Sequence, residues 1–394
     1  MSPARGESVD ILVVGGGIQG AGALQAAAAA GHSALLLEAR APAWGTSSRS
    51  SKLIHGGLRY LESGQLQLVR ESLAERAILL AIAPHLVRLS EFFIPIYHET
   101  TRRPWEIRAG LSLYAVLGGL VKDARFGRVP HAEWGALDGL STERLQAVFR
   151  YQDGQTDDAH LVRAVLRSAE ELGARVECPA AFLAAEREVD GWRARFRTGA
   201  AEQCVCCRVL VNAAGPWASA VQECVRGAPQ PPGVDLVGGA HIEIEGLLER
   251  GIYYVEAPRD RRAVFAIPWK GRTLVGTTET PFAGDPAEVA PLRSEIDYLL
   301  EVFQHYFPGR QGAVLDAWAG LRVLPKGPGK AFSRPREVVL SFDDERLPSY
   351  VGIYGGKLTG YRATAARVLA RLEPNLPGAE RKADTATLRL PEVE

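Results

Sequence analysis

The sequence predicts an α/β fold with an α+β insertion: a Rossmann-like domain built from separated segments, and a second domain with a mixed or antiparallel sheet. Three observations support this prediction. An apolar strand, a glycine-rich turn and an alanine-rich helix follow one another near the N-terminus. Short alternating segments further along are typical of an antiparallel meander. The chain of 394 residues is also too long for one simple core, which favours two intergrown domains.

The N-terminal segment has the pattern of a βαβ unit. Residues 9–14 form an apolar run that indicates a buried parallel strand, residues 20–31 indicate a helix, and residues 33–38 indicate a second strand. Helical periodicity returns over residues 70–83 and over residues 158–173, and each run ends at a residue that stops a helix, a proline or a glycine.

The rest of the chain alternates between short strands and helices. The pattern predicts strands over residues 175–178, 182–187, 192–198, 205–212, 234–244, 252–256, 263–267, 273–276, 338–342 and 350–353, and helices over residues 292–307 and 357–372. This interleaving predicts three parts: a discontinuous nucleotide-binding domain (residues 1–90, 150–233 and 315–375), a substrate or cap domain (residues 91–149 and 234–314) and a C-terminal tail (residues 376–394).

The composition excludes several classes of protein. The 46 basic and 46 acidic side chains cancel, so no global field indicates a nucleic-acid partner. Cys206 and Cys207 are adjacent and the five cysteines are an odd number, which favours reduced thiols over a disulfide framework or a zinc site, and we predict no metal. The first ten residues lack the apolar run of a signal peptide. We therefore expect a cytoplasmic protein.

Residues 105–121 are the most membrane-like stretch of the chain. Glu106 and Arg108 interrupt its start, and the uncharged remainder, residues 109–121, is shorter than the roughly 20 apolar residues of a membrane-spanning helix. We predict a buried helix here. An interfacial helix, which would place the protein peripherally on the inner face of the cytoplasmic membrane, stays open as an alternative.

The turn after the first strand fits the G-x-G-x-x-G pattern of a dinucleotide site, with Gly15, Gly17 and Gly20 at the required positions. These glycines permit a tight turn, a close approach of the backbone to a pyrophosphate, and close packing of the helix on the strand. Glu38 ends the next strand, where a carboxylate can accept hydrogen bonds from ribose hydroxyls. The fingerprint predicts a dinucleotide and leaves FAD and NAD both open.

Eight further motifs resemble the FAD-dependent glycerol-3-phosphate dehydrogenases, which belong to the D-amino-acid-oxidase-like flavoprotein superfamily. They occur in the family's order across essentially the whole chain: GTSSRSSKLIHGGLRYLE at residues 45–62, DDAHL at 157–161, NAAGPW at 212–217, VFAIPW at 264–269, VGTTE at 275–279, GDP at 284–286, GLR at 320–322 and YGGKLTGY at 354–361.

The resemblance implies FAD as cofactor and oxidation of glycerol 3-phosphate, or a close phosphorylated polyol, to the ketone. Electrons would then pass to quinone or another acceptor, and a homodimer is compatible with the sequence. The chain departs from the family at residues 237–240, VGGA, where members often have a lysine and a serine. Members also usually continue into a C-terminal helical domain, so the resemblance predicts a short form without it.

Cofactor-binding residues are expected in the loops that follow strands, where small or hydroxyl-bearing residues let the backbone approach a ligand. Besides the three glycines and Glu38, the resemblance implies contacts to FAD from Ala39, Thr46, Ser47, Ser50, Lys52, Leu53, Ala214, Gly215, Trp217, Gly320, Gly356, Lys357, Leu358 and Thr359. Lys357, at the predicted start of the last helix, would compensate the negative charge of a reduced flavin ring.

A phosphate dianion favours guanidinium groups, which donate paired hydrogen bonds. The resemblance places Arg59, Arg322 and Arg334 against the substrate, together with Tyr60 and Lys357. Arg322 and Lys357 are also candidate catalytic residues.

Oxidation of an alcohol also needs a proton acceptor, and His55 and His241 are the two candidates. The sequence does not decide which of the two accepts the proton. Two alternative functions stay open beside the dehydrogenase. One is an amine or 2-hydroxy-acid oxidase of the same superfamily, and the other is a non-catalytic flavin-binding subunit.

Overall fold

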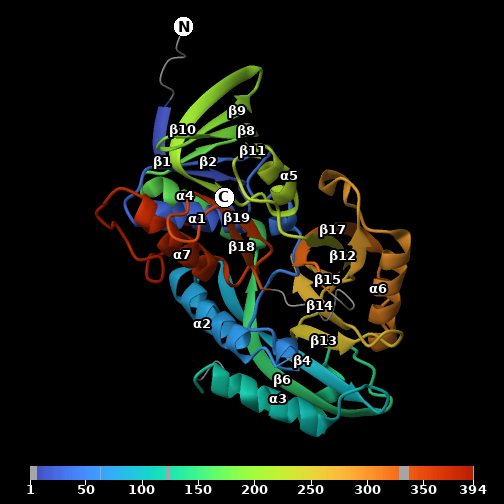
Figure 1. The fold of residues 1–394 in the computed structure, drawn as a ribbon. Helices are drawn as coiled ribbons and strands as arrows, with labels where there is room; N and C mark the ends of the chain where they lie inside the picture. The colour runs from blue at the N-terminus through green and yellow to red at the C-terminus, as the bar shows by residue number, and fades with distance from the viewer. Residues whose placement is uncertain (1–6, 63, 121–124, 328–336, 394) are drawn as a thin grey trace.

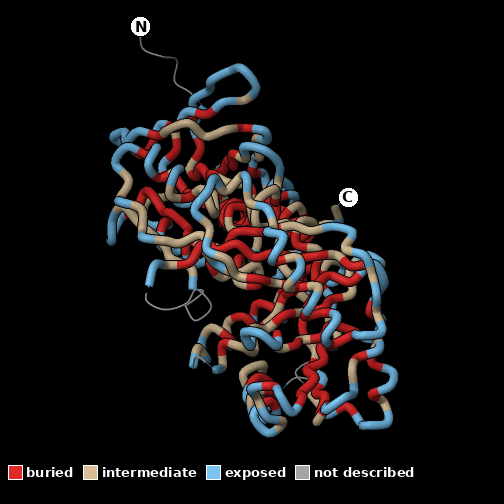
Figure 2. Tube along the Cα trace, turned by 90° about the vertical axis from the view of Figure 1, so that its right-hand side faces the viewer, coloured by how far each residue is buried: buried red, intermediate tan, exposed pale blue. Residues whose placement is uncertain are grey.

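The computed structural model describes residues 7–62, 64–120, 125–327 and 337–393 as two large mixed sheets with helices packed around them (Figure 1). The first sheet has nine strands and the second has ten. Buried residues run through the interiors of both halves of the molecule, and exposed residues follow the outer loops and helix faces (Figure 2). This arrangement is an α/β fold of two intergrown sheets.

The first sheet is built around the N-terminal βαβ unit. Strand β1 (Glu7–Val14) pairs in parallel with β2 (Ala34–Leu37) on one side and β10 (Ala201–Asn212) on the other. Strand β19 (Tyr350–Tyr354) then pairs in parallel with β10. The remaining strands of this sheet are β7 (Arg175–Glu177), β8 (Ala181–Glu188), β9 (Gly191–Thr198), β11 (Val225–Arg226) and β18 (Val339–Phe342).

Three long helices cover one face of this sheet. Helix α1 (Ile18–Ala29) is almost wholly buried and packs between α4 (Asp158–Glu171) and α7 (Tyr361–Leu372). Its run of alanines lets these neighbours approach closely, and alternate side chains of β1 and β2 face the same apolar cluster, those of Ile11, Val13, Ala34 and Leu36. The βαβ prediction is therefore confirmed. The last helix is an exception, because it begins at Tyr361 and not at residue 357.

The loop before α7 contains Lys357. Gly355 and Gly356 have φ angles of +76° and +93°, left-handed values that favour glycine. Lys357 follows them and still lies in the loop, because the helix begins only at Tyr361. The expectation that Lys357 occupies the first helical turn was wrong.

The second sheet is interleaved with the first along the chain. Strand β12 (Val234–Ile244) pairs with β15 (Arg272–Gly276), β16 (Thr280–Phe282) and β17 (Val314–Pro325), all antiparallel. The sheet continues through β14 (Ala263–Trp269) and β13 (Ile252–Glu256), with helix α6 (Arg293–Tyr306) packed against it. Most of β17 was assigned by the sequence to the nucleotide-binding domain, and the domain boundaries stay a prediction.

Two long strands of the second sheet were not predicted. They are β4 (Val87–Tyr97) and β6 (Leu145–Thr156), which pair along almost their full length and are flanked by β3 (Leu53–Ile54) and β5 (Phe126–Arg128). Residues 92–97 of β4 are buried without interruption, so no alternation of polar and apolar residues reveals the strand.

Two helices lie at the outer edge of this half of the molecule, α2 (Leu66–Ile82) and α3 (Pro104–Leu117) (Figure 1). Helix α3 is buried through Ile107, Leu111 and Tyr114, as expected for a core-facing helix, but its other side exposes Trp105 by 71%. Among the described residues, no helix is long and apolar enough to cross a bilayer. Short 3-10 turns complete the chain, together with α5 (Ala218–Glu223).

Candidate functional site

A cavity of about 510 Å³ opens where the parallel strands of the first sheet end. Residues that directly follow β1, β2, β10 and β19 all line it: Gly15, Glu38, Ala213 and Gly355. The carboxyl ends of parallel strands at one edge of an open sheet are where ligands bind in α/β folds. The cavity therefore occupies the expected position for a dinucleotide.

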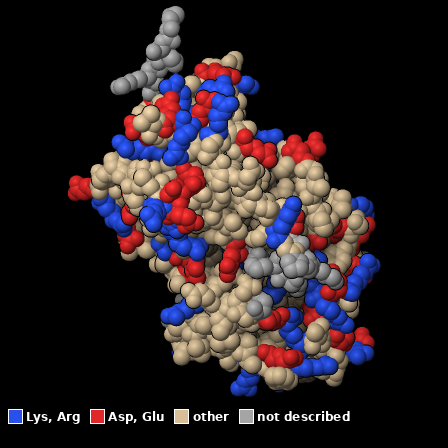
Figure 3. All heavy atoms as spheres, in the orientation of Figure 1, with Lys and Arg blue, Asp and Glu red and all other residues tan. Residues whose placement is uncertain are grey.

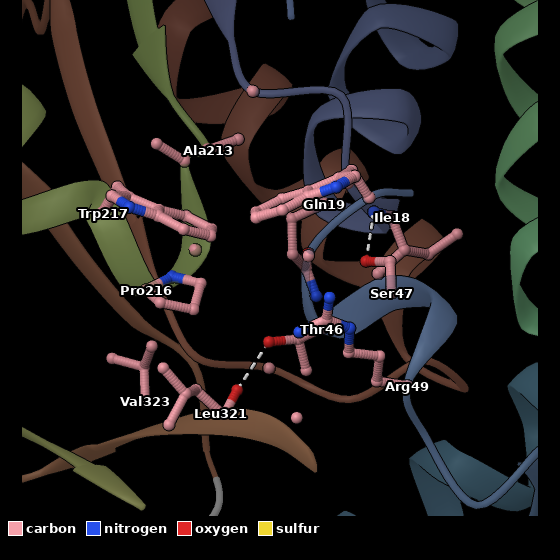
Figure 4. Close-up of a pocket in the computed structure, with 18 of the residues that line it drawn as sticks. Ile18, Gln19, Thr46, Ser47, Arg49, Ala213, Pro216, Trp217, Leu321 and Val323 are labelled. Atoms are coloured by element: carbon pink, nitrogen blue, oxygen red, sulfur yellow. Dashed lines mark hydrogen bonds between the residues drawn. The ribbon is translucent and has the colours of Figure 1, made fainter. Parts of the chain in front are cut away.

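The glycine-rich turn forms one wall of this cavity. Gly15 has a φ of +108°, and a Cβ added at Gly20 would lie 1.8 Å from the carbonyl oxygen of Gly15, so helix α1 can approach the turn only because Gly20 has no side chain. Ser47 Oγ accepts a hydrogen bond of 3.0 Å from the backbone N–H of Ile18 at the start of α1 (Figure 4). The positive end of α1 thus faces the cavity beside a hydroxyl-rich loop.

Glu38 is held at the end of β2 by the backbone. Its two carboxylate oxygens accept hydrogen bonds from the N–H groups of Gly16, at 2.7 Å, and Arg40, at 2.8 Å. Each oxygen can accept a further hydrogen bond, and Glu38 lines the cavity. This placement suits hydrogen bonding to ribose hydroxyls.

The loop of residues 46–53 crosses from the first sheet to the second. Thr46 Oγ1 donates to the carbonyl oxygen of Leu321 in β17 at 2.7 Å (Figure 4). Ser50 donates to Asp158 through both its N–H and its hydroxyl. Lys52 Nζ lies 2.7 Å from Asp158, and both side chains are at least 93% buried. The side chain of Lys52 therefore belongs to a buried ion pair and does not line the cavity. The sequence analysis had instead expected Lys52 to contact the cofactor.

The donor set of the cavity fits FAD. Both amide atoms of Gln19, which lines the cavity in Figure 4, are buried without a hydrogen-bond partner among the described residues. Buried polar groups of this kind normally have a partner, so Gln19 is available to a polar ligand. The lining also combines a helix N-terminus, suited to a pyrophosphate, with backbone at Gly355 and Gly356 that leaves room for a flat ring.

A second cavity of about 110 Å³ adjoins the first. Ser51, His55, Tyr60 and Arg322 line both of them, so the smaller cavity is continuous with the larger one. Its described lining is cationic, because it holds the guanidinium groups of Arg59, Arg262 and Arg322 and one carboxylate, that of Glu279, which is 4% exposed and lies 3.8 Å from Arg322 and 4.0 Å from Arg262. The smaller cavity is suited to a compact anion beside the cofactor.

Arg322 contacts Thr277, Thr278 and Glu279 at the junction of the two cavities. Its guanidinium donates to the carbonyl oxygen of Thr278 and to Thr277 Oγ1, each at 3.3 Å, and lies 3.8 Å from Glu279 Oε1. Lys357 Nζ sits 3.8 Å from the centre of the Tyr60 ring and contacts Ser72 Oγ at 3.5 Å. The two cations approach the shared region from different sheets.

The two candidate histidines have different surroundings. His241 is 2% exposed, and its Nε2 lies 2.8 Å from Ser51 Oγ. Burial, together with the nearby charges of Arg322 and Lys52, lowers the pKa of His241 to about 3. His241 is therefore neutral at physiological pH. His55 is only half-buried and lines both cavities.

Most of the sequence-predicted site residues meet at these two cavities. The larger cavity contains Gly15, Gly17, Glu38, Ala39, Thr46, Ser47, Ser50, Leu53, His55, Tyr60, Ala214, Gly215, Trp217, His241, Gly320, Arg322, Gly356, Lys357, Leu358 and Thr359. Arg59 lies in the smaller one. Gly20 lies behind the turn, Lys52 is turned away, and Arg334 falls outside the described residues.

Several lining residues were missed by the sequence analysis. Gln19 and Arg49 lie inside motifs that were already recognised, so their position within the motif was the available signal. Trp44 packs against Trp217 at the larger cavity, with ring centroids 5.8 Å apart. Arg262 precedes β14 in an exposed-looking charged run, and nothing in the local pattern shows that it turns inward.

Known proteins share both the sequence and the fold. The family model described as FAD dependent oxidoreductase matches residues 10–370. A glycerol-3-phosphate dehydrogenase of Pseudomonas aeruginosa is 40% identical, covering 93% of this chain and 72% of its own. A D-erythritol 1-phosphate dehydrogenase of Brucella abortus is 36% identical, covering 95% and 75%. The crystal structure of a Bacillus halodurans glycerol-3-phosphate dehydrogenase with FAD superposes with a TM-score of 0.74 at 27% identity, covering 99% and 68%.

The glycine turn provides a test of the cofactor site. A Cβ at Gly17 would meet only Ser47 Oγ, at 3.1 Å, so the Gly17→Ala variant should fold. We expect its affinity for FAD to fall at least about tenfold, because the methyl group would occupy the approach of a pyrophosphate. Fluorescence titration of the apoprotein with FAD measures this change. The Gly20→Ala variant should instead lose folding stability. Equal FAD affinity of Gly17→Ala and the wild type would contradict the assignment of the glycine turn to the pyrophosphate of FAD.

The lowered pKa of His241 predicts a pH dependence of stability. Because the folded protein keeps His241 neutral down to about pH 3, while the unfolded chain binds a proton near pH 6.5, stability is lost as the pH falls through this window. Between pH 7 and pH 5 this group should contribute roughly 2 kcal/mol of that loss. Urea unfolding of the His241→Asn variant should show a correspondingly smaller decrease than the wild type. Equal decreases would show that His241 titrates normally.

Proposed function

The chain belongs to the FAD-dependent oxidoreductase family, and we propose that it oxidises glycerol 3-phosphate, or a close phosphorylated polyol, to the ketone, dihydroxyacetone phosphate in the first case. The relatives at 36–40% identity that are named for phosphorylated polyols support this substrate class. The observation that carries the proposal is the cationic cavity beside the cofactor site, lined by Arg59, Arg262 and Arg322.

The reaction removes a hydride from the carbinol carbon and a proton from its hydroxyl group. Bound FAD supplies the acceptor for the hydride at N5. The residues of this chain hold the phosphate and orient the carbinol. Arg59 and Arg322 would bind the phosphate dianion through charge-assisted hydrogen bonds. Lys357, which lines the larger cavity, would provide positive charge near the reacting end.

We assign the proton acceptor to His55 and an orienting role to His241. His241 has a pKa of about 3 and its Nε2 is engaged by Ser51, so it is a weak base at neutral pH. His55 lines both cavities and is less buried. A neutral His241 would hold Ser51 in the wall shared by the two cavities.

The first test is the visible spectrum of the purified protein under anaerobic conditions. The flavin bands should bleach on addition of glycerol 3-phosphate and persist with glycerol, lactate or an amino acid. The Arg322→Met variant should need at least about tenfold more substrate for half-reduction, because it lacks charge-assisted hydrogen bonds of about 1.5–3 kcal/mol. Arg272→Met is the matched control, since Arg272 pairs with Glu243 at the surface of the same sheet. Flavin bands that persist after addition of glycerol 3-phosphate would contradict the proposed substrate.

We further propose that electrons leave the reduced flavin to a quinone or another carrier at a membrane surface, and that helix α3 makes the membrane contact. Trp105, Leu113 and Val116 are 38–71% exposed and recur at helical spacing along one side of α3, and Leu120, 71% exposed, lies just beyond the end of the helix. Much of the lower face over α3 in Figure 3 is uncharged. Such a stripe can lie in the headgroup region of a bilayer.

A homodimer stays a prediction, which analytical ultracentrifugation would check.

Vesicle sedimentation tests the membrane contact. The wild type should partition onto vesicles of mixed phosphatidylglycerol and phosphatidylcholine. The double variant Leu113→Ser/Val116→Ser should partition at least about fivefold less, because it removes apolar area from the stripe. Val189→Ser is the control, since Val189 is fully exposed at the turn between β8 and β9. Equal partitioning of the three proteins would contradict the proposal that α3 makes the membrane contact.

A further inference from the structure

A buried polar chain connects helices α2 and α3 to the loop that carries His55. Tyr114 of α3 is 3% exposed, and its hydroxyl donates to Asp153 Oδ2 at 2.5 Å. The same hydroxyl accepts a hydrogen bond from the backbone N–H of Gly56 at 2.8 Å. Arg76 of α2 donates to Asp153 Oδ1 at 2.8 Å. Four groups from four separate segments are therefore joined in one sequence of hydrogen bonds.

The chain is enclosed, so each of its members depends on the next. Asp153 is 1% exposed and Arg76 is 3% exposed. Burial raises the pKa of Asp153, and the Arg76 cation opposes that rise. A buried charge is tolerated only when it is paired and hydrogen-bonded. Asp153 consequently fixes the direction of the Tyr114 O–H bond, which leaves the lone pairs of this hydroxyl for Gly56.

The contact with Gly56 bears on the site because His55 precedes it. The backbone N–H of His55 donates to Thr359 Oγ1 at 3.2 Å, so two consecutive N–H groups are bound by hydroxyls from opposite sides of the loop. A Cβ at Gly56 would lie 2.5 Å from the Tyr114 hydroxyl, which shows how closely the backbone approaches α3. Tyr114 thus holds the backbone directly after His55, the residue that lines both cavities.

We propose that Tyr114, Asp153 and Arg76 are positioning residues that hold His55 against the substrate. The proposal rests on the function proposed above for the same site. None of the three lines either cavity. Their effect on the reaction acts through the backbone of Gly56, because an error of about 1 Å in the place of a reacting group can lower a rate about a hundredfold.

The Tyr114→Phe variant removes only the hydroxyl. We expect the rate constant for flavin reduction at saturating glycerol 3-phosphate, measured anaerobically by stopped flow, to fall at least about tenfold. The substrate dissociation constant should change less than about threefold, since the phosphate-binding arginines are untouched, and FAD content should stay at the wild-type level. This division between rate and affinity is not expected of a general loss of structure.

Two comparisons separate positioning from stability. Tyr97→Phe also removes a buried hydroxyl, one that donates to the carbonyl oxygen of Ser141 at 2.6 Å away from both cavities. It should lower the melting temperature to a similar degree and leave the reduction rate unchanged. The double variant Arg76→Met/Asp153→Asn removes both charges and keeps an amide oxygen to accept from Tyr114. It should reduce the flavin faster than either single variant.

The outcomes are distinct. Wild-type-like reduction by Tyr114→Phe, or equal slowing in Tyr97→Phe, would overturn the proposal. If the wild type itself is not reduced by glycerol 3-phosphate, the proposed substrate fails, and the visible circular dichroism of the bound flavin then decides the positioning role. A changed dichroism in Tyr114→Phe but not in Tyr97→Phe would support it, and unchanged spectra in both would overturn it.

Discussion

The buried ion pair between Lys52 and Asp158 is the interaction on which the site depends. Asp158 accepts hydrogen bonds from Lys52, from Ser50 twice and from its own helix start at Ala159, so its oxygens are fully used at the N-terminus of α4. Removal of either charge would leave the other buried and unpaired, at a cost of about 3–5 kcal/mol. The pair therefore locks the crossing loop in one shape.

That loop is shared by every part of the site. Thr46 and Ser47 face the cofactor cavity, and Ser51 holds His241 in the wall common to both cavities. Its far end leads into β3 of the second sheet and then to His55. Because the loop is bonded to α1 at Ile18 and to β17 at Leu321, a shift of either sheet would move both the cofactor wall and the substrate wall. The two sheets and the chemistry are coupled through these few backbone contacts.

Charge is arranged locally and not globally. The formal net charge is zero, yet three guanidinium groups and one carboxylate, that of Glu279, line the smaller cavity. Such a cluster attracts a compact dianion without making the whole surface cationic. His241 adds no charge to this cluster, because burial and the neighbouring cations both disfavour its protonation.

Local periodicity and a contiguous glycine motif are enough to predict the βαβ unit, most of the strands and helices, and a dinucleotide cofactor. Motifs also point to His55, Arg59 and Arg322. The folded chain was needed to show that Lys52 pairs with Asp158, that Arg262 lines the smaller cavity, and that Tyr114 contacts the backbone of Gly56. Each of these depends on contacts between residues distant along the chain. A local sequence pattern does not show which distant side chain a buried charge or hydroxyl group will contact.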